Sequence, residues 1–148
     1  MKARLGAAVA LAAVLTGCAS APEPTTAVVD VAGGPQFQVE LATTPDQQRD
    51  GLSGRHTLLE GTGMLFQFDR PAPREVWMAG MELPIDVAWI AGGQVIAVDT
   101  LEPCTTTDQS QCPRWTSPGD ADTLLEVPAG SLEAITPGTA ITIQEDTP

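Results

Sequence analysis

Apolar and polar residues alternate along much of this chain with a period of two. The clearest run covers residues 36–41, Gln-Phe-Gln-Val-Glu-Leu, in which every second side chain is apolar. That alternation is typical of a half-buried β-strand. Shorter apolar or alternating runs predict the remaining strands, which cover residues 27–31, 63–68, 75–78, 85–90, 94–101, 123–127 and 139–144. Gly92-Gly93 predicts a two-residue hairpin turn, because such turns favour residues that adopt positive φ.

Helical signals are few. Thr44-Pro45-Asp46-Gln47 offers a capping threonine, a proline suited to the first helical position and a glutamine that completes a capping box. The helix that begins there must be short, because glycines follow from residue 51. Residues 129–135 have room for one or two further helical turns. The pattern as a whole predicts a mainly β fold, a single compact β-sandwich or small barrel with one or two short helices.

The first eighteen residues follow a different pattern. Basic Lys2 and Arg4 precede an apolar run over 5–15 that is too short to span a bilayer, and small residues follow it. Leu15-Thr16-Gly17-Cys18 resembles the lipobox of bacterial lipoproteins. The resemblance implies cleavage before Cys18, a lipid on its sulfur and an extracytoplasmic domain anchored to the cell membrane, or to the outer membrane if the cell has two. The alternative is an ordinary signal peptide with Cys18 incidental.

These patterns divide the chain into four parts. We expect a lipoprotein signal peptide over residues 1–17, and a lipidated cysteine with a flexible linker over 18–34. A β domain should cover 35–144, and a frayed acidic tail 145–148. The mature length suits one domain, and a monomer is favoured.

Charge and cysteine content narrow the function classes. The chain has 19 acidic and 7 basic residues, with a net charge of −12. We therefore expect no nucleic-acid partner, because binding to phosphates relies on Lys and Arg. Outside the reducing cytosol, Cys104 and Cys112 favour a structural disulfide over a redox pair or a zinc site. We recognise no cofactor motif and expect no cofactor and no metal.

Six separated motifs, in order, resemble the family called domain of unknown function 192 (DUF192). They lie at residues 50–55, 63–68, 77–87, 103–104, 112–113 and 125–130. The resemblance implies a compact, mainly β domain that is often exported, and it implies no established activity. The family often has Lys and Asn after the Trp77-Met78 pair, where this chain has Ala79 and Gly80. A ligand role for that lysine therefore does not carry over.

Three charged residues are candidates for a site. Asp86 interrupts an apolar run, so we expect partial burial, where it either accepts hydrogen bonds from backbone amides, pairs with Arg55 or faces a ligand. The fork of Arg55 suits a carboxylate, and an internal partner is favoured. Glu126 faces the same choice as Asp86, but alternation with its apolar neighbours favours exposure.

Aromatic residues offer a second kind of site. Trp77 and Trp89 lie in apolar strands, which favours a place in the core. Trp115 is expected in the loop after Cys112-Pro113 and is the better stacking platform. His56 is the only histidine, and we interpret it as a surface residue. No catalytic residues are assigned, because no catalytic constellation is recognisable.

Together these features predict a non-catalytic binding or accessory module of the cell envelope for a small polar or glycan ligand. Its expected partners are the membrane, through the lipid, and that ligand. An alternative is a hydrolase with Asp86 and Glu126 as paired acids, which requires both on one site, about 5–10 Å apart. Another is an envelope assembly factor with a protein partner, which a large exposed apolar patch would favour. The candidate binding residues are Arg55, Met64, Trp77, Met78, Asp86 and Trp115.

Overall fold

The structure is a computed structural model that describes residues 25–145. Within this range strands dominate, which confirms the mainly β fold. The elements in chain order are β1 (Thr26–Val31), β2 (Gln36–Ala42), α1 (Pro45–Asp50), β3 (Thr62–Ala72), β4 (Glu75–Trp77), β5 (Ile85–Ala91), β6 (Gln94–Leu101), the 3-10 turn η1 (Gln109–Gln111), β7 (Arg114–Thr116), β8 (Ala121–Pro128) and β9 (Ile141–Glu145).

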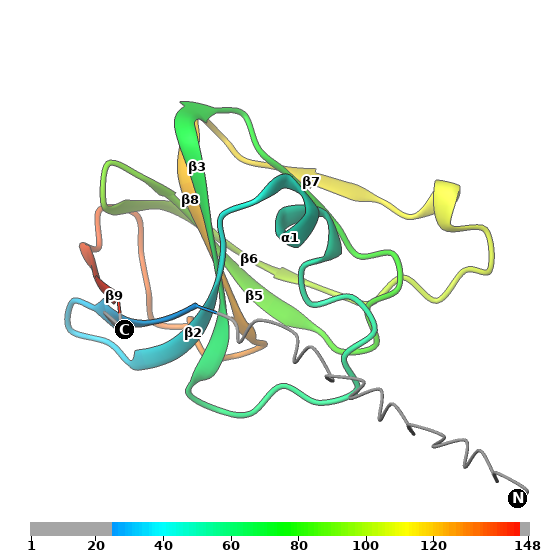
Figure 1. Cartoon of the computed structure of the whole chain (residues 1–148), viewed down its shortest axis with the longest axis horizontal. Coiled ribbons are helices and arrows are strands. Elements are labelled where there is room, and N and C mark those ends of the chain that lie inside the picture. The colour runs from blue at the N-terminus through cyan, green and yellow to red at the C-terminus, as the bar shows by residue number, and fades with distance from the viewer. Residues whose placement is uncertain (1–24, 146–148) are drawn as a thin grey trace, which may run out of the picture.

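Seven of the strands form one curled sheet in the order β6-β5-β8-β3-β2-β1-β9 (Figure 1). Every neighbouring pair is antiparallel except β2 and β3, which are parallel. The curl brings the start of β6 to the start of β9. There the Val95 amide donates to the Thr139 carbonyl at 2.9 Å, and the Ile141 amide donates to Gly93 at 2.8 Å. The sheet is therefore a half-barrel that closes at one end.

Strand alternation divides the core between the two faces of this sheet. Phe37, Leu65 and Leu125 belong to a first cluster, which Leu132 covers from the segment after β8. Phe66, Val87, Trp89 and Leu124 belong to a second cluster on the opposite face. Val76 and Met78, from β4 and the residue after it, cover that second cluster together with Leu52. Both faces of the central strands are therefore buried, which matters for every polar residue on them.

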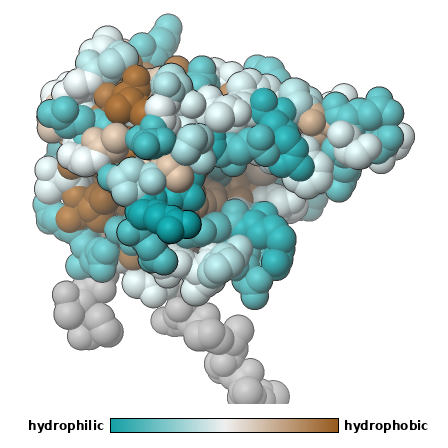
Figure 2. All heavy atoms as spheres, turned by 90° about the horizontal axis from the view of Figure 1, so that it is seen from above, coloured by the Kyte–Doolittle hydropathy of each residue, from teal (hydrophilic) through white to brown (hydrophobic). Residues whose placement is uncertain are grey.

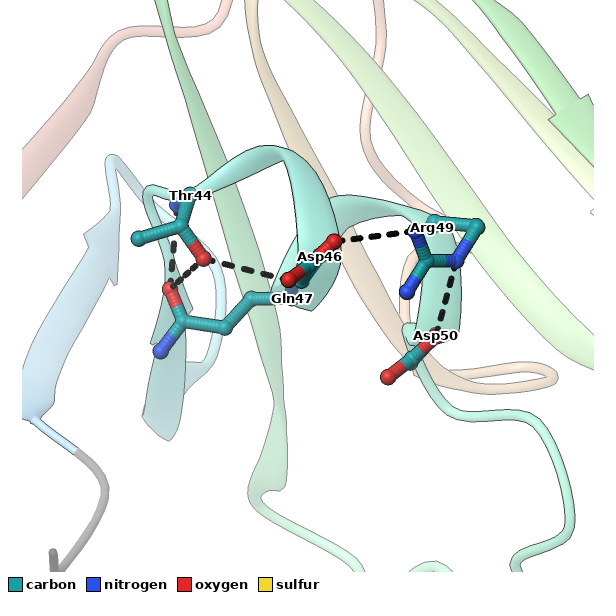
Figure 3. Close-up of polar contacts among 5 residues, drawn as sticks. All are labelled: Thr44, Asp46, Gln47, Arg49 and Asp50. Carbon is teal, nitrogen blue, oxygen red and sulfur yellow. Dashed lines mark hydrogen bonds and ion pairs between the residues drawn. The ribbon is translucent and has the colours of Figure 1, made fainter.

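Several local predictions are confirmed. Gly92 and Gly93 have φ values of 56° and 74°, as the hairpin turn requires. Thr44 and Gln47 form the expected capping box at the start of α1 (Figure 3). The Gln47 amide donates to the Thr44 hydroxyl at 3.3 Å, and the Thr44 amide donates to the Gln47 side chain at 3.0 Å.

Other expectations need correction. The domain begins before residue 35, because β1 pairs with both β2 and β9 inside the main sheet. Residues 129–135 form turns rather than a helix. The small sheet formed by β4 and β7 went unpredicted, because β7 has only three residues and finds its partner far away in the sequence.

The expected signal peptide and lipidated Cys18 lie outside the described residues, as does most of the expected tail. No helix within residues 25–145 is long and apolar enough to cross a membrane. The signal peptide and the lipid on Cys18 therefore stay predictions from the sequence.

A disulfide joins Cys104 to Cys112, with their Cα atoms 5.7 Å apart. This confirms the pairing expected from the sequence. The two cysteines close an arm between β6 and β7, which projects away from the main sheet (yellow in Figure 1). Cys104 also forms an isolated bridge with Ala79, next to β4. The disulfide therefore fixes the arm against the small sheet, and η1 lies within it.

Candidate ligand-binding site

A cavity of about 370 Å³ lies between the second face of the main sheet, α1 and the small β4–β7 sheet. Phe66, Ile85 and Leu124 line it from the main sheet, and Val76 and Met78 line it from the covering segment. Its polar lining comes from four separate parts of the chain, and consists of Gln48, Arg49, Asp50, Ser53, Glu75, Gln109, Arg114 and Glu126. The site is thus apolar along the sheet with polar groups around it, as in many small-molecule sites.

Glu126 is the polar residue that the main sheet itself contributes. On β8 it lies opposite Met64 of β3 and opposite Val87 of β5. The residue is buried, with 6% of its surface exposed. Burial raises the pKa of its carboxyl group to about 8. No residue within 25–145 forms a hydrogen bond or ion pair with that carboxyl group. Within the same range no side-chain oxygen is both fully buried and unpaired, so the carboxyl oxygens of Glu126 reach the open space of the cavity.

The expectation that Glu126 is exposed is therefore wrong. Alternation correctly separates Glu126 from Leu125 and Val127, which pack in the first core cluster. The opposite face is not solvent, however, because the second core cluster and the segments above it cover it. A period of two shows which side chains share a face, but it does not show what covers that face.

Gly63 allows β3 to approach β8 closely at this point. A Cβ atom on Gly63 would lie 2.3 Å from the Glu126 carbonyl oxygen, a distance at which the backbone of β8 would have to move. Glycine is therefore needed here to keep the strand that carries Glu126 in place.

Asp86 lies on the other face of the sheet. Its register partner on β8 is Val127, whereas Val87 is opposite Glu126. Asp86 is 1% exposed, and its carboxylate accepts hydrogen bonds from the Leu132 amide at 2.8 Å and from the Thr100 hydroxyl at 2.7 Å. The hypothesis that Asp86 and Glu126 act as paired acids is therefore wrong, because the sheet separates them.

Arg55 does have an internal partner, but it is Glu40 rather than Asp86. Both of its terminal nitrogens donate to the Glu40 carboxylate, at 2.8 and 2.6 Å. The hydrogen bonds from Arg55 hold the pKa of Glu40 below its usual value. The pair lines a separate hollow beside β2 and the start of β3. Arg55 is therefore outside the cavity that contains Glu126.

Trp77 lies at the cavity with 39% of its surface exposed, so its expected place in the core is wrong. In β4 it is Val76 that points into the second core cluster. The Arg114 guanidinium lies over the Trp77 ring, 4.4 Å from its centroid. The same arginine forms a 2.7 Å ion pair with Glu75. These three side chains hold the β4–β7 edge of the cavity together.

The other two tryptophans have different places. Trp89 is fully buried, as expected, and its indole nitrogen donates to Asp99 at 2.6 Å. Trp115 is half-buried on β7 and packs against the second core cluster, rather than standing on a free loop. His56 is exposed, as expected, and its Nδ1 atom contacts Glu82. Neither Trp115 nor His56 lines the cavity.

The structure therefore brings together only part of the predicted site. Trp77 and Met78 line the cavity, and Met64 is the register neighbour of Glu126. Arg55 and Asp86 lie elsewhere. Sequence reasoning missed Arg114 and did not place Glu126 in the binding set. The adjacent apolar pair Leu124-Leu125 was the available signal, because consecutive apolar residues are typical of a strand that is buried on both faces.

Comparison with known proteins gives a family and a fold. Residues 27–143 match the model of the family DUF192, described as "Uncharacterized ACR". A crystal structure of a "putative transcription regulator" from Sinorhizobium meliloti 1021 is similar, with a TM-score of 0.68 and 26% identity. The match covers 81% of this chain and 93% of that chain.

A second similar crystal structure is that of a protein of unknown function from Novosphingobium aromaticivorans DSM 12444, with a TM-score of 0.70 and 24% identity. That match covers 88% of this chain and 93% of that chain. A comparison with curated proteins gives no match. The comparisons thus identify relatives of the same shape without an activity to transfer.

Proposed function

Because this chain belongs to the DUF192 family, which is itself uncharacterised, we propose a function from the cavity rather than from relatives. The protein is a non-catalytic binding or accessory module for a small polar or glycan ligand. A lipid on Cys18 anchors it at the cell envelope.

The carboxyl group of Glu126 carries this proposal. A largely buried carboxyl group is poorly hydrated, and a ligand in the cavity can supply the hydrogen-bond partner that the described chain does not. Glu126 lines a cavity large enough for a small organic molecule, with Trp77 at its edge. An exposed aromatic ring beside a hydrogen-bonding group suits the face of a sugar ring.

We propose no catalytic residue. The hydrolase alternative needed Asp86 and Glu126 in one site, and they lie on opposite faces of the sheet. The assembly-factor alternative called for a large exposed apolar patch. Within residues 25–145 the exposed large apolar side chains are Leu59 and Trp77. Figure 2 shows apolar residues in small separate areas of a largely hydrophilic face. A small ligand therefore fits better than a protein partner.

The envelope location is supported by the amino-acid sequence. The lipobox-like residues 15–18 lie outside the described residues, so the anchor rests on the motif. A structural disulfide agrees with an oxidising compartment. The description of the Sinorhizobium meliloti relative as a regulator is not carried over, because a net charge of −12 opposes binding to nucleic-acid phosphates.

Nuclear magnetic resonance (NMR) titration of the isotope-labelled protein with glucose, N-acetylglucosamine and glycerol tests the binding function. We expect saturable shifts at the Trp77 indole and at residues that line the cavity, and a loss of those shifts in Glu126→Leu. The control is Glu133→Gln, because Glu133 is exposed and does not line the cavity. A wild-type protein that shows no shifts with these three probes, or only shifts outside the cavity, would exclude the glycan ligand.

A further inference from the structure

Among the charged residues that line the cavity, Glu126 alone lacks an oppositely charged partner within residues 25–145. The lining contains two guanidinium groups and three carboxyl groups. Arg49 forms an ion pair with Asp50 at 3.2 Å, and with Asp46 just outside the lining (Figure 3). Arg114 forms an ion pair with Glu75 at 2.7 Å. Glu126 is therefore the one lining carboxyl group without an opposite charge in the described chain.

We propose that the ligand of this cavity carries a cationic amine that forms an ion pair with Glu126. This inference rests on the binding function proposed above and names the chemical class of its ligand. An ammonium group supplies both the hydrogen-bond donors and the positive charge that the ionised carboxylate lacks. It also makes the charge of the lining neutral overall. An anionic ligand would find no free positive charge in the lining, because both guanidinium groups are already ion-paired.

The rest of the cavity limits the body of the ligand. Phe66, Met78 and Leu124 present an apolar wall on the same side of the sheet as Glu126. The ligand is therefore an amine on a compact apolar or ring-shaped body rather than a bare cation. Trp77 limits the ligand at the edge of the cavity, where the Arg114 guanidinium already lies over its ring at 4.4 Å.

The charged groups on the elements around Glu126 already have partners, which leaves the Glu126 carboxyl group to the ligand. Its direct neighbours in the sheet, Met64 and Val87, are apolar. One strand further on each side, Glu40 of β2 is held by Arg55, and Asp99 of β6 accepts a hydrogen bond from Trp89. Above the sheet, the charged lining groups are Arg49 and Asp50 of α1, Glu75 of β4 and Arg114 of β7, and all four are ion-paired.

Binding of a cation should therefore release a proton. Burial raises the pKa of Glu126 to about 8, so at pH 7 roughly ten carboxyl groups are protonated for each one that is ionised. A cation binds the ionised form. Its apparent affinity should thus rise about tenfold for each pH unit below 8 and level off above it. A neutral ligand that accepts a hydrogen bond from the protonated carboxyl group would show no such rise.

Isothermal titration calorimetry of the full-length protein with benzylamine and benzyl alcohol tests the proposal, because the two probes differ in charge but have the same ring. The titrations are run at pH 6, 7 and 8, in two buffers with different ionisation enthalpies. For benzylamine we expect about tenfold tighter binding at pH 7 than at pH 6, and release of nearly one proton per molecule bound at pH 7. Glu126→Gln should bind benzylamine at least tenfold more weakly and without the pH dependence, whereas Glu133→Gln should behave like the wild type.

A second measurement uses the wild-type protein and so does not depend on the folding of a variant. The ¹³C shift of the Glu126 carboxyl carbon is followed against pH, with and without benzylamine. We expect the titration midpoint to fall by at least one pH unit when benzylamine binds. An unchanged midpoint would overturn the amine proposal.

The possible results distinguish a failure of the amine proposal from a failure of the binding function. If benzyl alcohol or glucose binds in the cavity as tightly as benzylamine, at every pH and equally well in Glu126→Gln, the amine class is wrong but the binding function stands. If benzylamine, benzyl alcohol and the sugars all leave the cavity resonances unchanged at millimolar concentration, both proposals fail.

Discussion

Asp86 of β5 and Glu126 of β8 lie on neighbouring strands but on opposite faces of the same sheet. Each is a buried carboxyl group, yet their surroundings differ. Two hydrogen bonds hold Asp86 in place, one of them from the backbone of the segment that covers the first core cluster. Glu126 has no such bond within the described chain and lines a cavity. A structural role therefore fits Asp86, and a binding role fits Glu126.

Replacing Asp86 by Ala should destabilise the fold. The Leu132 amide would lose its partner in a buried position, and a cavity would remain on the first face of the sheet. An unpaired buried donor and lost packing together cost about 2–4 kcal/mol of the free energy of unfolding. Urea denaturation measures this loss, with Asp120→Ala as a control at an exposed site. An Asp86→Ala protein of unchanged stability that no longer binds ligand would contradict the structural role.

The pH dependence of stability should reveal Glu126. Its pKa rises from an ordinary value of 4.5 to about 8 in the folded protein. Between these values the folded protein binds more protons than the unfolded chain, so the contribution of Glu126 to stability is lost as pH rises from about 4.5 to 8. The loss across this window is on the order of 4 kcal/mol. Denaturation of wild type and Glu126→Gln at pH 5, 6, 7 and 8 measures it.

The stability of Glu126→Gln is compared with that of wild type at each pH, because other groups also titrate in both proteins. Relative to wild type, Glu126→Gln should become steadily more stable as pH rises from 5 to 8, and Glu133→Gln should not. Parallel stability curves for wild type and Glu126→Gln would show that the carboxyl group has an ordinary pKa.

The sequence predicts most of the main sheet, because alternation is a local property. Residues 36–41 follow the pattern of β2 residue by residue, and Gly92-Gly93 forms the expected turn. The capping box at Thr44 is local in the same way. Where the structure differs, the deciding contact is distant in the sequence. β7 pairs with β4 from about forty residues away, and this pairing leaves Trp77 exposed.

The candidate site was predicted only in part for the same reason. Trp77 and Met78 line the cavity, because the motif that suggested them lies beside it. Alternation predicts an exposed Glu126, because nothing near it in the sequence indicates that α1 and the small sheet cover its face of β8. Arg55 was expected to have an internal partner and does, but alternation alone did not identify Glu40 as that partner.

Arg55 should matter little for binding in the cavity. It pairs with Glu40 beside a separate hollow, and about a third of each side chain is exposed. Arg55→Ala should therefore reduce stability by about 1 kcal/mol or less, since solvent screens the pair. NMR shifts in the cavity on addition of benzylamine should stay as in wild type. Arg114→Ala is the matched comparison, because it removes an arginine that, unlike Arg55, lines the cavity and stacks on Trp77. Loss of cavity binding in Arg55→Ala would contradict this placement.

Reduction of the Cys104–Cys112 disulfide should lower the melting temperature. The bond closes a short loop, and such a cross-link contributes roughly 2–3 kcal/mol. Because Gln109 of the arm lines the cavity, ligand binding should also weaken when the arm is released. Calorimetry with and without reductant measures the first effect, and the Cys104→Ser, Cys112→Ser double variant provides the control. That variant should melt at the temperature of the reduced protein and be insensitive to reductant. Two free thiols in the mass of the unreduced native protein would contradict the prediction.

The lipid anchor can be tested without knowledge of the ligand. If the lipobox-like residues 15–18 direct processing, the mature protein begins at Cys18 and carries acyl chains. Each buried CH₂ contributes about 0.8 kcal/mol, so two or three chains hold a domain at the membrane firmly. Mass spectrometry of protein from the membrane fraction should show loss of residues 1–17 and the added mass of a diacylglyceryl group. Cys18→Ala should leave the protein without lipid and in the soluble fraction. Cys104→Ser, which removes a cysteine without touching the motif, should remain with the membrane. A mature protein that begins elsewhere and carries no lipid would show that an ordinary signal peptide is removed instead.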